Sequence, residues 1–408
     1  MKRGIQGRLE RRGSGTEPYH AFLPNPLPPE PPLLLDGQLH DWLERANRAL
    51  GRLDGICMLL PDASLFLYLY IRKEAVLSSQ IEGTQSSFSE LLLFENSAAP
   101  GVPFDDVREV SRYVAAMEHG LARLRGGFPL SLRLLKEIHG VLMAEGRGSE
   151  RTPGEFRSSQ NWIGDTRPGN AAFVPPPAET LFEHLGALEK FLHNDPVRTP
   201  TLIKAALSHV QFETIHPFLD GNGRLGRLLI TFLLCAEGAL SQPLLYLSLY
   251  FKQHRARYYE LLQHVRTDGG WEEWLSFFLE GVETTAEQAT GTARRILGLF
   301  DADRLRINAL GRSAGSALRV HHYMQKTPLL SIPRTAAELE LSGPTVAATL
   351  RNLEEIGMVV EVTGRGRDRI FAYRDYIAIL NEGTELPGKP MFTAPPVLRP
   401  ERKEKLDA

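Results

Sequence analysis

The chain has 408 residues, which is long enough for about two or three domains with buried cores. Its 42% hydrophobic and 24% charged residues are typical of a soluble globular protein, and the net charge of −2 gives no overall attraction to nucleic acid or membranes. No apolar run approaches the roughly 18 residues of a transmembrane helix, and the start lacks a signal-type apolar core. The only cysteines, Cys57 and Cys235, lie in apolar surroundings, which predicts buried thiols in a reducing cytoplasm.

The first segment, residues 1–36, is rich in arginine and then in proline. A basic arm for nucleic acid is one interpretation. The composition favours a disordered start that becomes an extended strap across the next domain. Apolar periodicity then predicts helices over 36–53 and 64–77, and residues 84–101 are expected to be a connecting segment.

Further helices are predicted over 104–124, 131–144 and 178–193. Between the last two, short apolar stretches at 160–164 and 172–174 flank a turn-forming sequence rich in Asp, Pro, Gly and Asn. This pattern predicts a small β-hairpin that contains Asn161, Trp162, Ile163 and Gly164.

The most informative segment is His216-Pro-Phe-Leu-Asp220-Gly221-Asn222-Gly223-Arg224-Leu-Gly226-Arg227. Apolar residues at helical spacing precede it and follow it, so it is predicted to be a tight turn between two helices. The second helix is expected to begin at about Asn222 to Arg224, which leaves free N–H groups and the positive end of the helix dipole in the turn.

These features indicate a polyphosphate site. Gly221 and Gly223 allow a sharp turn with uncovered amides, and helix N-termini bind phosphate. Arg224 and Arg227 are three residues apart, so both can reach the same ligand. Asp220 is placed to hold Mg²⁺, which usually takes one or two carboxylates together with substrate oxygens.

His216 is the candidate general base, since an unperturbed imidazole has a pKa near ~6.5. Other interpretations of the segment fit less well. Gly221-x-Gly223-x-x-Gly226 matches the dinucleotide-binding fingerprint, but that motif follows a strand. The Walker A pattern is absent. An ordinary turn between helices does not explain so many charged residues.

Aromatic residues cluster after this segment, and most are expected to belong to the core. Tyr258 or Tyr259 is a candidate for the wall of an adenine pocket, with core packing as the alternative. The last helix of this domain is expected to continue to about residue 300.

Residues 304–376 are predicted to be a separate unit of helices followed by a basic hairpin, a pattern that looks like a winged helix. Binding to DNA would use helix 343–356 with Arg351, together with Arg365 and Arg367 of the hairpin. Glu354 and Glu355 on the same helix weaken attraction to phosphate, so a role in protein docking or oligomerisation is favoured. Residues 383–408 are expected to be a disordered tail.

The segment 216–227 resembles the signature of the Fic family, His-x-Phe-x-(Asp/Glu)-Gly-Asn-Gly-Arg-x-x-Arg, at every specified position. The resemblance covers roughly residues 20 to 280. It implies a mainly α fold with the small hairpin as a flap, and transfer of AMP from ATP to a Ser, Thr or Tyr hydroxyl of a protein. The expected domains are 1–36, 37–103 with an inhibitory helix, the Fic core 104–300, and the winged helix 304–376.

The resemblance also implies residue roles. His216 would remove the hydroxyl proton, Asp220 would bind Mg²⁺, and Asn222 with the two glycine amides would hold the α-phosphate. Arg224 and Arg227 would bind the β- and γ-phosphates. Catalysis would then consist mainly of positioning and charge stabilisation.

The sequence Ser78-x-x-x-Glu82-Gly83 resembles the inhibitory motif of this family. Glu82 would pair with Arg227, and a guanidinium held by a carboxylate cannot also hold a γ-phosphate. The flap would bind the target protein by strand addition. Self-modification and a homodimer are also expected, whereas a membrane partner is not. AMP removal, another phosphate-linked donor, and a DNA-binding regulator with a dormant core are the alternatives.

Overall fold

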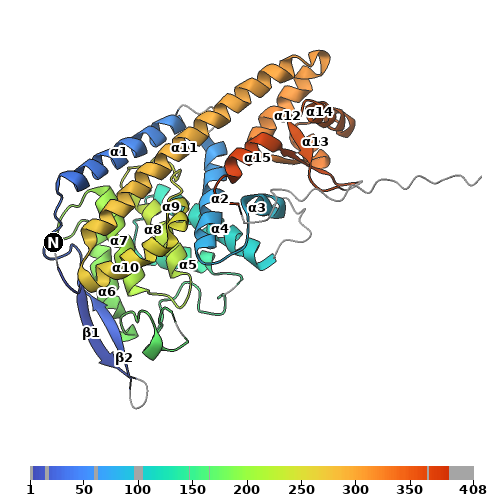
Figure 1. Ribbon diagram of the computed structural model, residues 1–408. Helices are drawn as coiled ribbons and strands as arrows, with labels where there is room; N and C mark the ends of the chain where they lie inside the picture. Colours follow the sequence, from blue (N-terminus) through green and yellow to red (C-terminus); the bar gives the residue numbers. More distant parts are fainter. Residues whose placement is uncertain are drawn as a thin grey trace, which may run out of the picture. The chain divides into compact units, whose positions relative to one another are not determined.

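The structure is a computed structural model that describes residues 3–13, 18–58, 63–95, 104–146, 148–164, 166–364 and 367–385. The chain divides into two units, Met1–Ser86 with Pro103–Ala293, and Ser87–Val102 with Arg294–Ala408. The elements of the first unit are β1 (Gly7–Arg12), β2 (Tyr19–Pro24), α1 (Gly37–Met58), α2 (Ala63–Ile81), α4 (Phe104–Arg125), α5 (Leu132–Leu142), α6 (Leu181–Leu192), α7 (Thr201–Ile215), α8 (Asn222–Ala236), α9 (Ser248–Gln253), α10 (Arg255–Asp268) and the first part of α11 (Trp271–Asn308). These positions confirm a mainly helical fold (Figure 1).

The core of the first unit surrounds α7. Every residue of this helix after Thr201 is buried, including Lys204, whose ammonium group forms a 2.7 Å ion pair with Glu237. A helix that is buried on all sides belongs at the centre of a domain. Helix α8 packs against α7, so the turn that joins them is held between two buried helices.

Helix α1 lies along the first part of α11 (Figure 1). Arg45 pairs with Glu283 at 2.9 Å, and Arg52 pairs with Glu287 at 3.1 Å. Arg52 and Glu287 are exposed and Glu283 is only 12% exposed, so the second pair contributes little stability.

The prediction for residues 1–36 was only partly right. Strands β1 and β2 pair in antiparallel orientation, with Gly7 opposite Pro24. Strand β2 buries Ala21, Phe22 and Leu23, and this apolar run rather than the surrounding arginine and proline residues decides the local structure. The strap does appear after β2, where the carbonyl oxygen of Asn25 accepts a 2.9 Å hydrogen bond from Gln211 of α7.

Gly120 lies where α4 crosses α8, and a Cβ at this position would overlap the ring of Phe232. Gly120→Ala is expected to lower the free energy of unfolding by about 1–3 kcal/mol, because overpacking outweighs the helix-propensity gain of up to about 1 kcal/mol. Gly186→Ala in α6 is the matched control, since a Cβ there meets open space and should stabilise the protein. Urea unfolding of both variants tests this pair, and equal stability changes would contradict it.

The second unit contains α3 (Phe88–Glu95), the remainder of α11, α12 (Ala314–Lys326), β3 (Leu329–Ser331), α13 (Ile332–Glu338), α14 (Gly343–Glu355), β4 (Val359–Glu361), β5 (Ile370–Tyr373) and α15 (Arg374–Asn381). The strands form one antiparallel sheet in the order β3-β5-β4. Ser342 caps α14 as expected, because its hydroxyl oxygen accepts a 3.2 Å hydrogen bond from the Thr345 N–H.

Two expectations need correction here. Residues 84–101 are not only a connection, because α3 forms within them and packs against α15. The domain boundary expected at 300–304 falls inside α11, which continues unbroken to Asn308. Arg365 and residues 386–408 lie outside the described residues, whereas Arg351 and Arg367 are exposed. The winged-helix interpretation stays a prediction.

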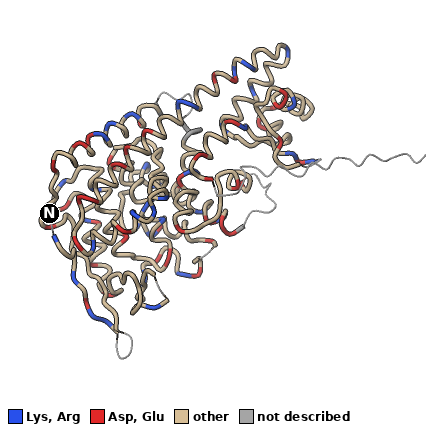
Figure 2. Tube along the Cα trace, viewed as in Figure 1, with Lys and Arg blue, Asp and Glu red and all other residues tan. Residues whose placement is uncertain are grey.

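Charged residues of both signs are spread along each unit rather than gathered by sign (Figure 2). In the part of the chain that the structure describes, no helix is long and apolar enough to cross a membrane. Cys235 is a free thiol that is partly exposed rather than buried, and the side chain of Cys57 lies outside the described residues.

Candidate active site

The turn between α7 and α8 has the geometry that its sequence predicts. His216 ends α7 in the left-handed region, with φ 49° and ψ 62°, and its N–H donates to the Phe212 carbonyl at 2.9 Å. Gly221 has φ 75°, and a Cβ there would lie 2.7 Å from the sulfur of Met143. Helix α8 begins at Asn222, so its unpaired N–H groups face the turn. A non-glycine residue with positive φ carries strain that often marks a functional site.

The side chain of His139 packs against this turn and stabilises it. The ring of His139 lies 3.7 Å from that of Phe218, which is completely buried. The Gly154 N–H donates to Nδ1 of His139 at 2.8 Å. The proton is therefore on Nε2, which donates to the Asp220 carbonyl at 3.0 Å. Burial lowers the pKa of His139 to about 4, so the ring stays neutral. The sequence carried no signal for His139, because it lies on α5, far from the motif in the chain.

Asn222 also braces the turn. Its side-chain oxygen accepts from the Phe218 N–H at 2.9 Å, and its amide donates to the Phe218 carbonyl at 2.8 Å. The side chain is therefore committed to the loop, which favours a bracing role over the expected contact with the α-phosphate. The backbone N–H of Asn222 belongs to the first turn of α8, where N–H groups have no partner within the helix.

Arg227 is held by the end of α2. Its Nε donates to the Ser78 hydroxyl at 2.8 Å, and its Nη2 donates to the Ser78 carbonyl at 3.0 Å and to the Glu82 carboxylate at 2.7 Å. The Arg227 side chain is 2% exposed and that of Glu82 is 29% exposed. Gly83, with φ 96°, lies just beyond the end of the helix. The predicted inhibitory residues therefore lie directly on the second arginine of the motif.

The charges of this pair stabilise each other. Burial alone would raise the pKa of Glu82, but the charge and hydrogen bond of Arg227 outweigh it and hold that pKa below its usual value. Burial likewise disfavours the charged guanidinium, yet the carboxylate of Glu82 raises the pKa of Arg227 further. Both groups are thus charged at neutral pH, and the Glu82 carboxylate occupies an N–H donor of Arg227.

Arg224 has a carboxylate partner that the sequence did not reveal. Its Nη1 lies 2.7 Å from Oε1 of Glu109 on α4, and both side chains are buried. Glu109 takes only one of the five N–H donors of the guanidinium. Nε of Arg224 is buried with no hydrogen-bond partner in the described structure, so a donor remains for an anionic ligand.

Asp220 fits the role of a magnesium ligand by its chemistry. One carboxylate oxygen accepts a 2.7 Å hydrogen bond from the Gly221 N–H. The side chain is partly exposed, and within the described ranges it forms no ion pair. The same residues contain no group of three or more His, Cys, Asp or Glu side chains that could hold a metal by themselves. A single carboxylate suits Mg²⁺, which takes its other ligands from water and substrate phosphates.

His216 is suited to act as a base. Burial, followed by the charge of Arg266, lowers its pKa to about 4, so the imidazole is neutral at physiological pH. Its Nδ1 is buried without a hydrogen-bond partner in the described structure. A neutral ring can accept a proton directly.

The expected flap is reduced to one antiparallel bridge. Ile163 and Phe173 exchange two backbone hydrogen bonds, at 2.8 and 3.2 Å, and Gly164 has φ 113°. Asn161 points to the motif, where its amide donates to the carbonyls of His216 and Phe218 at 3.2 and 2.9 Å. Trp162 is 37% exposed. Asp165 of the turn lies outside the described residues.

The two tyrosines differ. Tyr258 is 1% exposed, and its hydroxyl bonds Nε2 of His209 at 2.8 Å. This placement favours core packing over an adenine-lining role for Tyr258. Tyr259 is 40% exposed, so its assignment to an adenine pocket stays a prediction.

Two family models match parts of the chain. Residues 40–122 match the Fic/DOC family N-terminal model, and residues 129–234 match the Fic/DOC family model. Residues 129–234 are therefore similar to a Fic domain. The braced turn, both arginines and His216 lie in or at the end of the matched regions, as does the Glu82 that pairs with Arg227.

Known relatives extend this comparison. The protein adenylyltransferase Fic of Aedes aegypti is 30% identical over 258 residues, which cover 62% of this chain and 48% of that protein. The protein of the same name from Culex quinquefasciatus is 30% identical over 257 residues, with the same coverage. The chain thus spans about half the length of these relatives. A crystal structure of a Fic family protein from Desulfovibrio desulfuricans G20 covers 84% of this chain and 98% of its own, with a TM-score of 0.55 and 20% identity, which shows a shared fold.

Proposed function

We propose that this protein transfers AMP from ATP to a Ser, Thr or Tyr hydroxyl of a target protein, itself included, and releases pyrophosphate. The observation that carries the proposal is the pair Arg227–Glu82. A carboxylate is bound at 2.7 Å by an arginine in the first turns of a helix whose N-terminus faces the base His216. This geometry suits the phosphates of ATP once Glu82 moves away.

The reaction follows from the same residues. The neutral His216 accepts the proton of the target hydroxyl, whose oxygen attacks the α-phosphorus. The new oxygen–phosphorus bond forms as the bond to the β-phosphate oxygen breaks, and pyrophosphate leaves. Arg224 and Arg227 stabilise the charge that develops on the leaving group. Glu82 inhibits transfer because it competes for Arg227.

Magnesium is expected with the nucleotide. Asp220 would hold the ion, and the ion would offset the negative charge of the triphosphate. Asp220→Asn is expected to lower kcat/KM for ATP about 10- to 100-fold, because the neutral amide is a weaker ligand at nearly the same volume. A titration of activity against MgCl₂ should show saturation at higher concentration in the variant. An unchanged magnesium dependence would remove Asp220 as the ligand.

The partners and location are part of the proposal. The bridge Ile163–Phe173 would accept the target segment by strand addition, with Trp162 exposed beside it. The few cysteines suit the cytoplasm. A homodimer is proposed from the resemblance stated above. A docking role for residues 304–376 is proposed because Glu354 and Glu355 weaken attraction of helix 343–356 to phosphate.

The experiment that tests this function is incubation of the purified chain, and of its Glu82→Gly variant, with ATP and MgCl₂. Intact mass spectrometry should show addition of AMP, and pyrophosphate should appear in equal amount. ATP hydrolysis without protein modification would contradict the proposal.

A further inference from the structure

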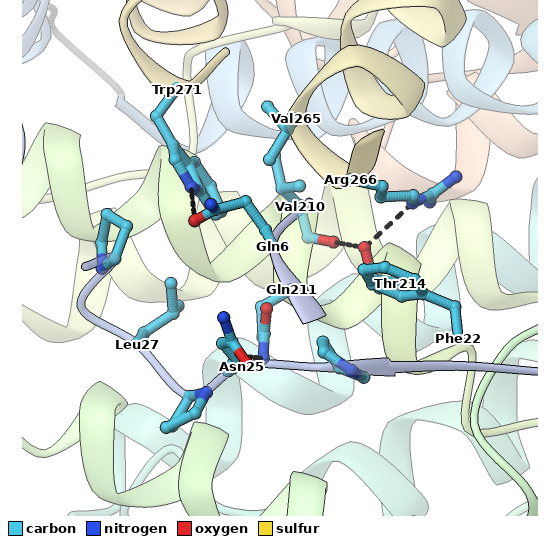
Figure 3. A pocket seen from close by; sticks show the side chains of 13 residues that line it. Gln6, Phe22, Asn25, Leu27, Val210, Gln211, Thr214, Val265, Arg266 and Trp271 are labelled. Carbon is cyan, nitrogen blue, oxygen red and sulfur yellow. Dashed lines mark hydrogen bonds between the residues drawn. The ribbon is translucent and has the colours of Figure 1, made fainter. Parts of the chain in front are cut away.

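Arg266 of α10 is a buried cation without a carboxylate partner among the described residues. Its side chain donates to the Thr214 hydroxyl at 3.0 Å (Figure 3). It also donates to the Glu213 carbonyl at 3.2 Å and to the Gln263 amide oxygen at 3.4 Å. It is 7% exposed. All of these acceptors are neutral oxygens, and burial lowers the pKa of Arg266 to about 10, an effect that the charge of the Glu213 carboxyl group opposes only in part. Such a charge suggests a role beyond packing.

The contacts of Arg266 join two parts of the site. Glu213 and Thr214 form the last turn of α7, directly before His216. On its other side, the guanidinium lies 4.0 Å from the ring of Phe173, which forms the flap bridge with Ile163. A cation over an aromatic ring is attracted to its face. Arg266 therefore connects the end of α7 to the flap through one side chain.

The position of Arg266 is itself fixed. Its carbonyl oxygen accepts a 2.9 Å hydrogen bond from the Gln6 N–H. The Gln6 side chain in turn accepts from the indole N–H of Trp271 at 3.0 Å (Figure 3). The Thr214 hydroxyl donates onward to the Val210 carbonyl at 2.8 Å. Hydrogen bonds therefore link Arg266 to Gln6 of the N-terminal segment and, through Gln6, to Trp271 of α11.

We propose that Arg266 is a positioning residue: it fixes the end of α7 so that His216 faces the flap-bound hydroxyl. The positive charge of Arg266 also disfavours protonation of the imidazole and lowers its pKa. The inference rests on the function proposed above. Arg266 touches no reacting atom, and it acts through Thr214 and the carbonyl of Glu213.

Other charged groups also face His216. Arg157, which precedes the flap, donates to the His216 carbonyl at 2.9 Å and adds positive charge. Glu82 at the end of α2 has the opposite effect on the His216 pKa. The Glu213 carboxyl group is buried, which raises its own pKa to about 7. Among the side-chain charges, that of Arg266 lowers the pKa of His216 most.

The test compares Arg266→Met, Arg266→Lys and Thr214→Val in the Glu82→Gly background. Met removes the charge and keeps most of the volume, Lys keeps the charge without the planar fork, and Val removes only the hydroxyl that Arg266 binds. Thermal unfolding first establishes that each variant folds. Two readouts follow: the pH dependence of kcat and KM for ATP, and the NMR titration of the His216 imidazole, identified by comparison with His216→Ala.

Arg266→Met is expected to lower kcat on the order of 10²-fold, as displacement of a reacting group does, with little change in KM for ATP. Its His216 titration and the acid limb of its kcat profile should both move to higher pH. Arg266→Lys should leave the pKa of His216 at its wild-type value. Thr214→Val should lower kcat and also leave the pKa of His216 unchanged. If Arg266→Met does not fold, Thr214→Val decides: a lower kcat supports the proposal, and an unchanged kcat contradicts it.

Two results would overturn the proposal. The first is an unchanged His216 titration in Arg266→Met. The second is a loss of stability with kcat unchanged in both Arg266→Met and Thr214→Val. If the Glu82→Gly parent transfers no AMP, the function proposed above fails, while the NMR titration still decides whether Arg266 acts on His216.

Discussion

Replacement of His216 with alanine is expected to reduce AMP transfer about 10²- to 10⁴-fold, the usual loss when a general base is removed. Binding of ATP should persist, because the phosphate-facing groups are Arg224, Arg227 and the N-terminus of α8. The reaction is measured in the Glu82→Gly background, and ATP affinity is measured by calorimetry. His322→Ala is a suitable control, since this exposed histidine lies in the second unit.

The pH profile sharpens this prediction. The base acts only when its imidazole is neutral, and burial lowers the pKa of His216 to about 4. Transfer should therefore persist as the pH falls through the ordinary histidine range near ~6.5, and decline only closer to the lowered value. Retained turnover in His216→Ala would exclude His216 as the base, whereas a profile with its midpoint near ~6.5 would show that the burial effect is absent.

Replacement of Glu82 with glycine is expected to raise AMP transfer about 5- to 150-fold, the range that typical coupling energies between two sites produce. The variant frees Nη2 of Arg227 from a carboxylate at 2.7 Å and removes a negative charge from the place of the phosphates. Initial rates at saturating ATP with a fixed acceptor concentration measure this gain.

Two further variants separate charge from contact. Glu82→Gln keeps the shape without the charge, so its gain should be smaller than that of Glu82→Gly. Ser78→Ala removes the acceptor of Nε but leaves the Glu82 carboxylate in place, so it should activate little. Equal rates in wild type and Glu82→Gly would mean that the end of α2 does not control Arg227 in solution.

The sequence predicted those parts of the molecule whose structure depends on residues close together in the chain. Helices α1, α4, α7 and α14 follow from apolar residues at helical spacing, and Ser342 marks a helix start by a hydrogen bond within one turn. The turn 216–222 follows from its glycine and its neighbouring helices. The pairing of Arg227 with Glu82 was predicted from the family resemblance, because two short motifs far apart in the chain do not show their contact by themselves.

Residues without a local pattern were missed. His139, Glu109 and Arg266 lie on three different helices. The side chains of His139 and Glu109 contact the motif, and that of Arg266 contacts the end of α7 just before it. A lone His, Glu or Arg on a helix has many possible positions, so periodicity says nothing about its partner. Strand β1 was missed for a related reason. In the described structure it pairs with β2 along one edge only, and its charged sequence is typical of a loop.

The central claim is that the α-phosphate of ATP, with its adenosine, becomes attached to protein. The most direct measurement incubates Glu82→Gly with MgCl₂ and ATP labelled at either the α- or the γ-phosphate, followed by denaturing gel separation. The account predicts label on the protein from α-labelled ATP and none from γ-labelled ATP, with His216→Ala in the same background unlabelled. Label from the γ-phosphate, or from neither while ATP binds, would contradict it.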